Sequence, residues 1–269
     1  MNDPQSDHDL PRALPCRLAR RALRAFAVLC AAAMGLAGAS ASEVKLLSGG
    51  AIEPGVHAAA EAFHKQSGMK VNITFNTTPQ MRARVAAGDV FDIVIAPPVA
   101  IDEFVKNGKV AVDAKVDVGR VGVGVAIRAG APRPDISNAE AVKRTVLEAE
   151  SLVFNRASTG IYFEGLLKKI GVWEQVQAKT TRYADGASVM EHLIKGQGRE
   201  VGFGASTEIL LLRERGLQLV GPLPAEVQNF TSYLAVPMVG SGNAEGGRAF
   251  LRFLATAESK ALFVARGID

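Results

Sequence analysis

Short runs of aliphatic and β-branched residues alternate along most of this chain with longer segments whose apolar residues recur every three or four positions. The first pattern is typical of strands, and the second is typical of helices that bury one face. Strands are predicted at 44–47, 71–75, 91–96, 121–127, 152–154, 181–183, 201–203, 217–220 and 233–236. Helices are predicted at 54–67, 80–87, 101–105, 160–169, 189–194, 206–215, 248–254 and 259–265. Because strands and helices follow one another in turn, the pattern predicts an α/β fold with mainly parallel sheets.

Two connectors rich in proline and glycine interrupt this alternation. They are the segments 128–134 (RAGAPRP) and 221–224 (GPLP). Segments of this composition separate compact parts of a chain, so they indicate a boundary between two lobes.

The first 41 residues have the composition of a secretory signal peptide. Five arginines precede an apolar run at 25–37, and Ala39, Ser40 and Ala41 then supply the small residues of a cleavage site. The apolar run is shorter than the roughly 20 residues that a membrane-spanning helix needs. The sequence therefore predicts a signal peptide at 1–41 and a mature protein that begins near Ser42 in the periplasm.

Charge and cysteine content exclude several classes of protein. The chain has 31 Lys+Arg against 27 Asp+Glu, and about half of that excess lies in the leader, so the mature protein is nearly neutral. It has no stripe of basic residues interleaved with aromatic ones, which argues against nucleic acid as a partner. Cys16 and Cys30 both lie in the leader, so the mature chain can form neither a disulfide nor a cysteine metal site. No cofactor and no metal are expected.

The candidate chemistry lies where three predicted strands run into helices. These junctions are the segments 48–51, 76–79 and 157–160, and each is rich in Gly, Ser or Thr. The first turn of a helix carries unpaired N–H groups and a partial positive charge, so several such turns that converge form an anion site without any lysine. Ordinary N-capping by the same residue types is the alternative.

The order and spacing of several stretches resemble one known family. The stretches are 46–52 (LLSGGAI), 75–78 (FNTT), 84–89 (RVAAGD), 91–95 (FDIVI), 159–162 (TGIY) and 170–173 (IGVW). With them, the chain resembles the periplasmic molybdate-binding proteins of ATP-driven importers from about residue 43 to residue 269. The resemblance implies a type II periplasmic binding fold, in which two α/β lobes are joined by two crossing strands and clamp a small anion. It places one lobe at 42–125 plus 231–269 and the other at 126–230. It also implies an ABC permease of the inner membrane as partner, and a monomer.

The family's anion ligands carry over only in part. Its first hydroxyl donor aligns with Ala51, next to Gly50, and its second aligns with Thr78, which can still donate. Its backbone contacts fall on Thr159 and on about Ala187, whereas its tyrosine donor aligns with Ala205. Each hydrogen bond that is not replaced costs about 0.5–1.5 kcal/mol. The resemblance thus favours molybdate or tungstate as ligand, with a small organic carboxylate as the rival.

Two arginines favour a small organic carboxylate as the ligand. Arg82 follows Thr78 by one helical turn, and Arg156 precedes the junction at Thr159. A guanidinium fork matches the two oxygens of a carboxylate. Both arginines are therefore candidate ligands, with a solvated surface position as the alternative.

An enzyme is not expected from these residues. His57 and His64 are seven positions apart, farther than the i, i+4 pair of a helical metal site, and no serine stands in a Gly-x-Ser-x-Gly elbow. The alternatives that stay open are a hydrolase or isomerase on the same fold, and a periplasmic sensor that closes around its ligand and signals to a receptor.

Overall fold

The computed structural model describes residues 43–111 and 113–269. The predicted signal peptide at 1–41, with Cys16 and Cys30, lies outside the described residues, and its cleavage stays a prediction. Within the described ranges, every helix is too short or too polar to cross a membrane.

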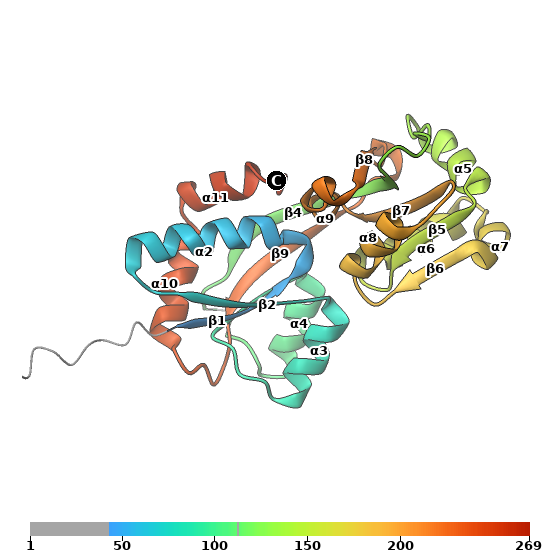
Figure 1. Ribbon diagram of the computed structural model, residues 1–269. Helices are drawn as coiled ribbons and strands as arrows, with labels where there is room; N and C mark the ends of the chain where they lie inside the picture. Colours follow the sequence, from blue (N-terminus) through green and yellow to red (C-terminus); the bar gives the residue numbers. More distant parts are fainter. Residues whose placement is uncertain (1–42, 112) are drawn as a thin grey trace, which may run out of the picture. The chain divides into compact units, whose positions relative to one another are not determined.

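Within the described residues, nine strands form the sheet structure (Figure 1). They are β1 (Val44–Gly49), β2 (Val71–Asn76), β3 (Ile93–Ala96), β4 (Val116–Arg128), β5 (Ser151–Asn155), β6 (Thr180–Tyr183), β7 (Glu200–Ala205), β8 (Leu217–Pro222) and β9 (Phe230–Pro237). The order is β2-β1-β3-β9-β4-β7-β5-β6, and β8 pairs with β4. Strands that helices connect, such as β1 with β2 and β5 with β6, run parallel. The mainly parallel α/β fold class is thereby confirmed.

The long strand β4 belongs to both halves of this arrangement. Its first part, up to Gly122, pairs antiparallel with β9, and its second part, from Val123, pairs antiparallel with β7 and β8. In Figure 1, β4 and β9 run together from the lobe that carries β1–β3 toward the lobe that carries β5–β8. These two strands are the crossing connections that the family resemblance implied. The exact residue limits of the two lobes stay a prediction.

Ten α-helices and four short 3₁₀ turns are assigned in the described ranges. The helices are α2 (Glu53–Ser67), α3 (Thr78–Ala87), α4 (Pro98–Lys106), α5 (Ala139–Glu148), α6 (Ser158–Lys169), α7 (Trp173–Val176), α8 (Gly186–Lys195), α9 (Ser206–Leu211), α10 (Ala244–Leu254) and α11 (Ala257–Val264). The turns are η2 (Gly50–Ile52), η3 (Gln177–Lys179), η4 (Arg213–Arg215) and η5 (Ala225–Val227).

The sequence analysis missed α5 and made α9 too long. Helix α5 begins at an Asn138 side chain that accepts a hydrogen bond from the Ala141 N–H, and it buries Val142 and Val146. That spacing is helical, but it lies between charged residues that weaken the apolar pattern. Helix α9 stops at Leu211 because Leu212 leaves helical geometry and a 3₁₀ turn follows.

Alternating side chains give each sheet two buried faces. In the first lobe, Leu46 packs with α2 and α10, whereas its neighbour Leu47 packs with α3 and α4. In the second lobe, Leu152 and Phe154 face one cluster and Val153 faces the other. Successive side chains of a strand point to opposite faces, so continuous apolar runs are what helices on both sides require.

Several strands lead directly into helical turns at their carboxyl ends. Strand β1 leads to η2 and α2, β2 to α3, β5 to α6, β6 to α8 and β7 to α9. In open α/β sheets, ligands bind beyond the carboxyl ends of the strands. This arrangement therefore positions the candidate site.

Candidate functional site

A cavity of about 450 Å³ lies beyond these strand ends. Its lining comes from both lobes, with η2, the start of α2 and the β2–α3 junction on one side and the starts of α6 and α8 on the other. Residue Glu208 of α9 and Tyr233 of β9 complete it.

Five of the residues singled out from the sequence line this cavity together. They are Gly50, Ala51, Thr78, Thr159 and Ala187. They come from four different strand–helix junctions, which the parallel strands bring to one edge. Their role as ligands stays a prediction, because the structure gives their position only.

The two arginines lie elsewhere. The Arg82 Nε donates to Glu103 Oε2 at 2.6 Å, so its guanidinium is turned toward α4 and away from the first turn of α3. Arg156 is exposed and does not line the cavity; its backbone N–H donates to the Tyr183 carbonyl. Among the described residues, the cavity lining contains no lysine, arginine or histidine. Ala205 is buried and is also absent from the lining.

Local capping holds two of these junctions in place, those at the starts of α3 and α8. Thr77 and Gln80 form a capping box at the start of α3, in which the Thr77 N–H donates to Gln80 Oε1 at 2.8 Å. Asp185 caps α8 by accepting from the Ser188 N–H at 2.8 Å. A capped first turn holds its remaining N–H groups in fixed directions. The cavity is thus bordered by preoriented neutral donors.

Three carboxylates also line the cavity, and the sequence analysis assigned none of them. Glu53 lies in the first turn of α2, 3.6 Å from His57 Nε2, and Asp185 is the cap of α8. The third, Glu208, lies in the first turn of α9. Nowhere in the described part of the chain do three His, Cys, Asp or Glu side chains come together as a metal site.

Glu208 lies between two glycine backbones. A Cβ atom added to Gly50 would lie 3.3 Å from Glu208 Oε1, and one added to Gly186 would lie 2.1 Å from Glu208 Oε2. The first lobe contributes Gly50 and the second contributes Gly186. A side chain at Gly186 would therefore force this carboxyl group to move.

The surroundings of Glu208 raise its pKa to about 7. Burial is the largest cause, and the negative charges of Asp185 and Glu53 add to it, whereas a hydrogen bond from the Ala205 backbone opposes it. A carboxyl group with a pKa near neutrality can both take and return a proton at physiological pH. Such values gather at catalytic sites.

Tyr233 supplies a hydrogen-bond donor that lines the same cavity. The residue is 5% exposed, and its ring lies against Gly49, where an added Cβ would be 2.6 Å from Cε1. Burial, and then the nearby charge of Glu208, raise the pKa of the Tyr233 phenol above its usual value. The hydroxyl therefore stays protonated and available as a hydrogen-bond donor.

Sequence reasoning missed these groups because it searched the junctions for hydroxyl donors and glycine. Glu53, Asp185 and Glu208 share a usable signal, since each lies at or next to the start of a helix that follows a predicted strand. Tyr233 gave no local signal, because it lies within β9 and only the fold brings it to the cavity.

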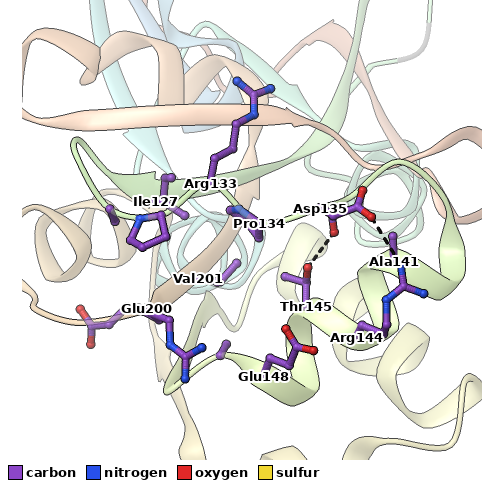
Figure 2. A pocket seen from close by; sticks show the side chains of 14 residues that line it. Ile127, Arg133, Pro134, Asp135, Ala141, Arg144, Thr145, Glu148, Glu200 and Val201 are labelled. Atoms are coloured by element: carbon purple, nitrogen blue, oxygen red, sulfur yellow. Dashed lines mark hydrogen bonds and ion pairs between the residues drawn. The ribbon is translucent and has the colours of Figure 1, made fainter.

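A second cavity, of about 250 Å³, lies in the second lobe beside α5 (Figure 2). Figure 2 shows Arg144 directed at Asp135, and the two form an ion pair at 3.4 Å. Arg133 donates to the Val220 carbonyl at 2.5 Å. The Arg144–Asp135 pair is solvent-exposed, and Arg133 is committed to a backbone carbonyl, so this cavity is the weaker candidate for ligand chemistry.

Comparison with known proteins identifies the family and similar folds. The family model for bacterial extracellular solute-binding proteins matches residues 44–269. An aconitate isomerase of Pseudomonas sp is 30% identical over 239 residues, which is 87% of this chain and 90% of that protein.

Solved structures are similar in fold at low sequence identity. The periplasmic molybdate-binding protein of Azotobacter vinelandii has a TM-score of 0.69 at 14% identity, over 84% of this chain and 98% of that one. The sulfate-binding protein of Mycobacterium tuberculosis has a TM-score of 0.69 at 18% identity, over 84% of this chain and 86% of that one. The resemblance inferred from the sequence is confirmed for family and fold.

Proposed function

This chain belongs to the bacterial extracellular solute-binding proteins, and we propose that it binds a small organic polycarboxylate and isomerises it by proton transfer through Glu208. The observation that carries the proposal is the carboxyl group with a pKa of about 7, held inside a ligand-sized cavity between Gly50 and Gly186. The aconitate isomerase relative supports aconitate, an unsaturated tricarboxylate, as the substrate.

The size of the cavity favours this class of ligand. A water molecule occupies about 30 Å³, so 450 Å³ holds on the order of fifteen water-sized groups. A tetrahedral oxyanion has five non-hydrogen atoms, whereas aconitate has twelve. The tricarboxylate therefore fills a larger part of the cavity than an oxyanion does.

The neutral donors can hold the substrate's charges. Thr78, Ser158, Thr159 and Ser188 line the cavity beside the first turns of α3, α6 and α8. Hydrogen bonds from such groups to a carboxylate are stronger than those between two neutral groups. They compensate for the absence of a basic residue in the lining and leave one face of the substrate toward Glu208.

Isomerisation of aconitate requires a proton to move between two carbon atoms. In the proposed reaction, ionised Glu208 removes a proton from the methylene carbon, and the electron pair of that C–H bond becomes the new double bond. The electron pair of the old double bond moves to the carbon at its far end. That carbon receives the proton back from Glu208. Tyr233 stays protonated and donates a hydrogen bond to the substrate carboxylate on which negative charge accumulates.

Capture of an inorganic oxyanion for import is the second candidate. Thr78 and the backbone donors near Ala51 and Thr159 support it, because these residues line the cavity and align with the anion ligands that the resemblance to molybdate-binding proteins implies. In that case, the protein is exported to the periplasm and delivers its ligand to an ABC permease. Glu53, Asp185 and Glu208 line the cavity and repel a dianion and a tricarboxylate alike, so the charge of the lining does not separate the two candidates.

One experiment separates the two. The chain from Ser42 onward is incubated with cis-aconitate in D₂O, and the trans isomer is followed by proton NMR. The proposal predicts protein-dependent formation of the trans isomer, which Glu208→Gln slows by about 10²–10⁴-fold. The same protein is melted with molybdate, tungstate, sulfate, phosphate and polycarboxylates. A ligand at about 100 times its Kd stabilises the fold by about 2.7 kcal/mol. Stabilisation by molybdate or tungstate alone, without turnover, would contradict the isomerase proposal and support oxyanion capture.

A further inference from the structure

Asn155 ends β5 at the edge of the cavity and has an unusual environment. It is 4% exposed, and it still lines the cavity. Neither the family resemblance nor the capping pattern of the sequence assigns it a contact with ligand.

Two hydrogen bonds determine the orientation of its amide. Asn155 Oδ1 accepts from the Ala157 N–H and from the Gly160 N–H, each at 3.0 Å. Only the oxygen of an amide can accept from two N–H groups, so the oxygen faces the start of α6 and the nitrogen faces the other way.

The backbone around Asn155 is equally constrained. Its carbonyl accepts from Arg182 Nη2 at 3.1 Å. A Cβ added to Gly160 would lie 1.8 Å from that carbonyl oxygen and 2.8 Å from Oδ1, so only glycine fits there. The Asn155 side chain is therefore held by the two N–H groups at the start of α6, and its backbone is held by Arg182.

The amide nitrogen, in contrast, has no partner within the described residues. No hydrogen bond from Asn155 Nδ2 is formed there, and the fully buried side-chain atoms without partners are others, namely Arg128 Nε, Arg182 Nε and Ser259 Oγ. The nitrogen thus keeps access to solvent, and the solvent beside Asn155 is that of the cavity. A rigid polar group with two free N–H donors is what recognition of a carboxylate needs.

We propose that Asn155 is a specificity-determining residue whose Nδ2 donates to one carboxylate of the ligand. This inference rests on the proposed polycarboxylate function. A neutral donor is favoured here over an arginine because the nearby carboxylates of Asp185 and Glu208 would pair with a cation and occupy it.

The test is the substitution Asn155→Asp. It keeps an oxygen toward the N–H groups of Ala157 and Gly160 and replaces the free nitrogen by an oxygen. Binding is measured by calorimetry with tricarballylate, the saturated analogue of aconitate, which cannot isomerise. We expect a loss of affinity of about tenfold to hundredfold, because a hydrogen bond to a charged group is lost. The melting temperature without ligand is expected to change little.

Asn76→Asp is the matched control for added negative charge. Asn76 lines the same cavity, but its Oδ1 accepts from Arg84 Nε at 2.8 Å and its Nδ2 donates to Gln80 Oε1 at 3.4 Å. The new carboxylate lies beside Arg84, so a smaller loss of affinity than in Asn155→Asp is expected.

A second measurement needs no variant. In a ¹H–¹⁵N spectrum of the unchanged protein, the side-chain amide signals of Asn155 are expected to shift when tricarballylate is added. Unshifted signals, or equal affinities of Asn155→Asp and the unchanged protein, would overturn the inference and leave the proposed function standing. Failure of the unchanged protein to bind any polycarboxylate would overturn both.

Discussion

Two sheltered carboxyl groups, Asp92 in the first lobe and Glu208 at the cavity, have opposite environments. Asp92 is 2% exposed and accepts from the Lys45 N–H at 2.7 Å, the Ser241 hydroxyl at 2.6 Å and the Asn243 N–H at 2.7 Å. Glu208 has a hydrogen bond from the Ala205 backbone, and its charged neighbours are carboxylates.

The comparison teaches that burial alone does not make a carboxyl group reactive. Donors around Asp92 stabilise its charge and tie β1 to the turn before α10, which is a structural role. Glu208 is half-buried and lacks such donors, so the loss of solvation holds its proton tightly and raises its pKa to about 7. A carboxyl group that has few hydrogen-bond donors and lines a ligand-sized cavity is therefore a candidate functional group.

The largest effect is expected for turnover in Glu208→Gln. General acid–base catalysis contributes about 10²–10⁴-fold, and glutamine cannot exchange a proton, so the rate of aconitate isomerisation should fall by that factor. Tricarballylate binding at pH 8 should not weaken, because a negative charge is removed. Initial rates measure the isomerisation of aconitate, and calorimetry measures the binding of tricarballylate. Unchanged turnover in Glu208→Gln would show that Glu208 is not the reactive group.

Asp92→Asn should lower the free energy of unfolding by about 2–4 kcal/mol, because it disrupts charge-assisted hydrogen bonds in a buried position. Urea unfolding followed by circular dichroism measures the change. Asp89→Asn is the control: Asp89 pairs with Arg84 at 2.7 Å with 39% of its side chain exposed, so a loss below about 1 kcal/mol is expected. Equal losses in the free energy of unfolding of the two variants would contradict a structural role of Asp92.

The stability of the protein should depend on pH through Glu208. Its pKa is about 7 in the folded protein and 4.5 as the reference value for the unfolded chain, so the folded state binds more protons between these values. The contribution of Glu208 is therefore fully favourable below pH 4.5 and is lost as the pH rises through 7. We expect a decline of about 2 kcal/mol, allowing for the remaining solvent access. Urea titrations from pH 4.5 to 8 should show this decline in the free energy of unfolding relative to Glu208→Gln. If the free energies of the two proteins changed in parallel with pH, the prediction would be contradicted.

The smallest effect is expected for Thr207→Val. Thr207 is 1% exposed and its hydroxyl donates to the Ala51 carbonyl at 2.5 Å, which links α9 to η2 next to Glu208. The variant should lose about 1 kcal/mol of stability and turn over less rapidly. Thr145→Val is the control, because its hydroxyl also donates to a backbone carbonyl, that of Asp135, at 2.7 Å, but far from η2 in sequence and fold. The control should lose similar stability and keep its turnover; equal turnover in both variants would exclude a positioning role for Thr207.

The sequence by itself determined the α/β class, the positions of the strands and most helices, and the edge at which the site lies. These features depend on short-range periodicity, on caps and on the rule that parallel strands end at one edge. For that reason Gly50, Ala51, Thr78, Thr159 and Ala187 line one cavity, although they lie far apart in the chain.

Only the tertiary structure decided which charged groups face the ligand. Arg82 pairs with Glu103, and Glu208 lies near Glu53 and Asp185, contacts between residues separated by long stretches of chain. Burial and the pKa of Glu208 depend on such through-space distances and on the water that packing excludes. A local sequence pattern carries no information about either quantity.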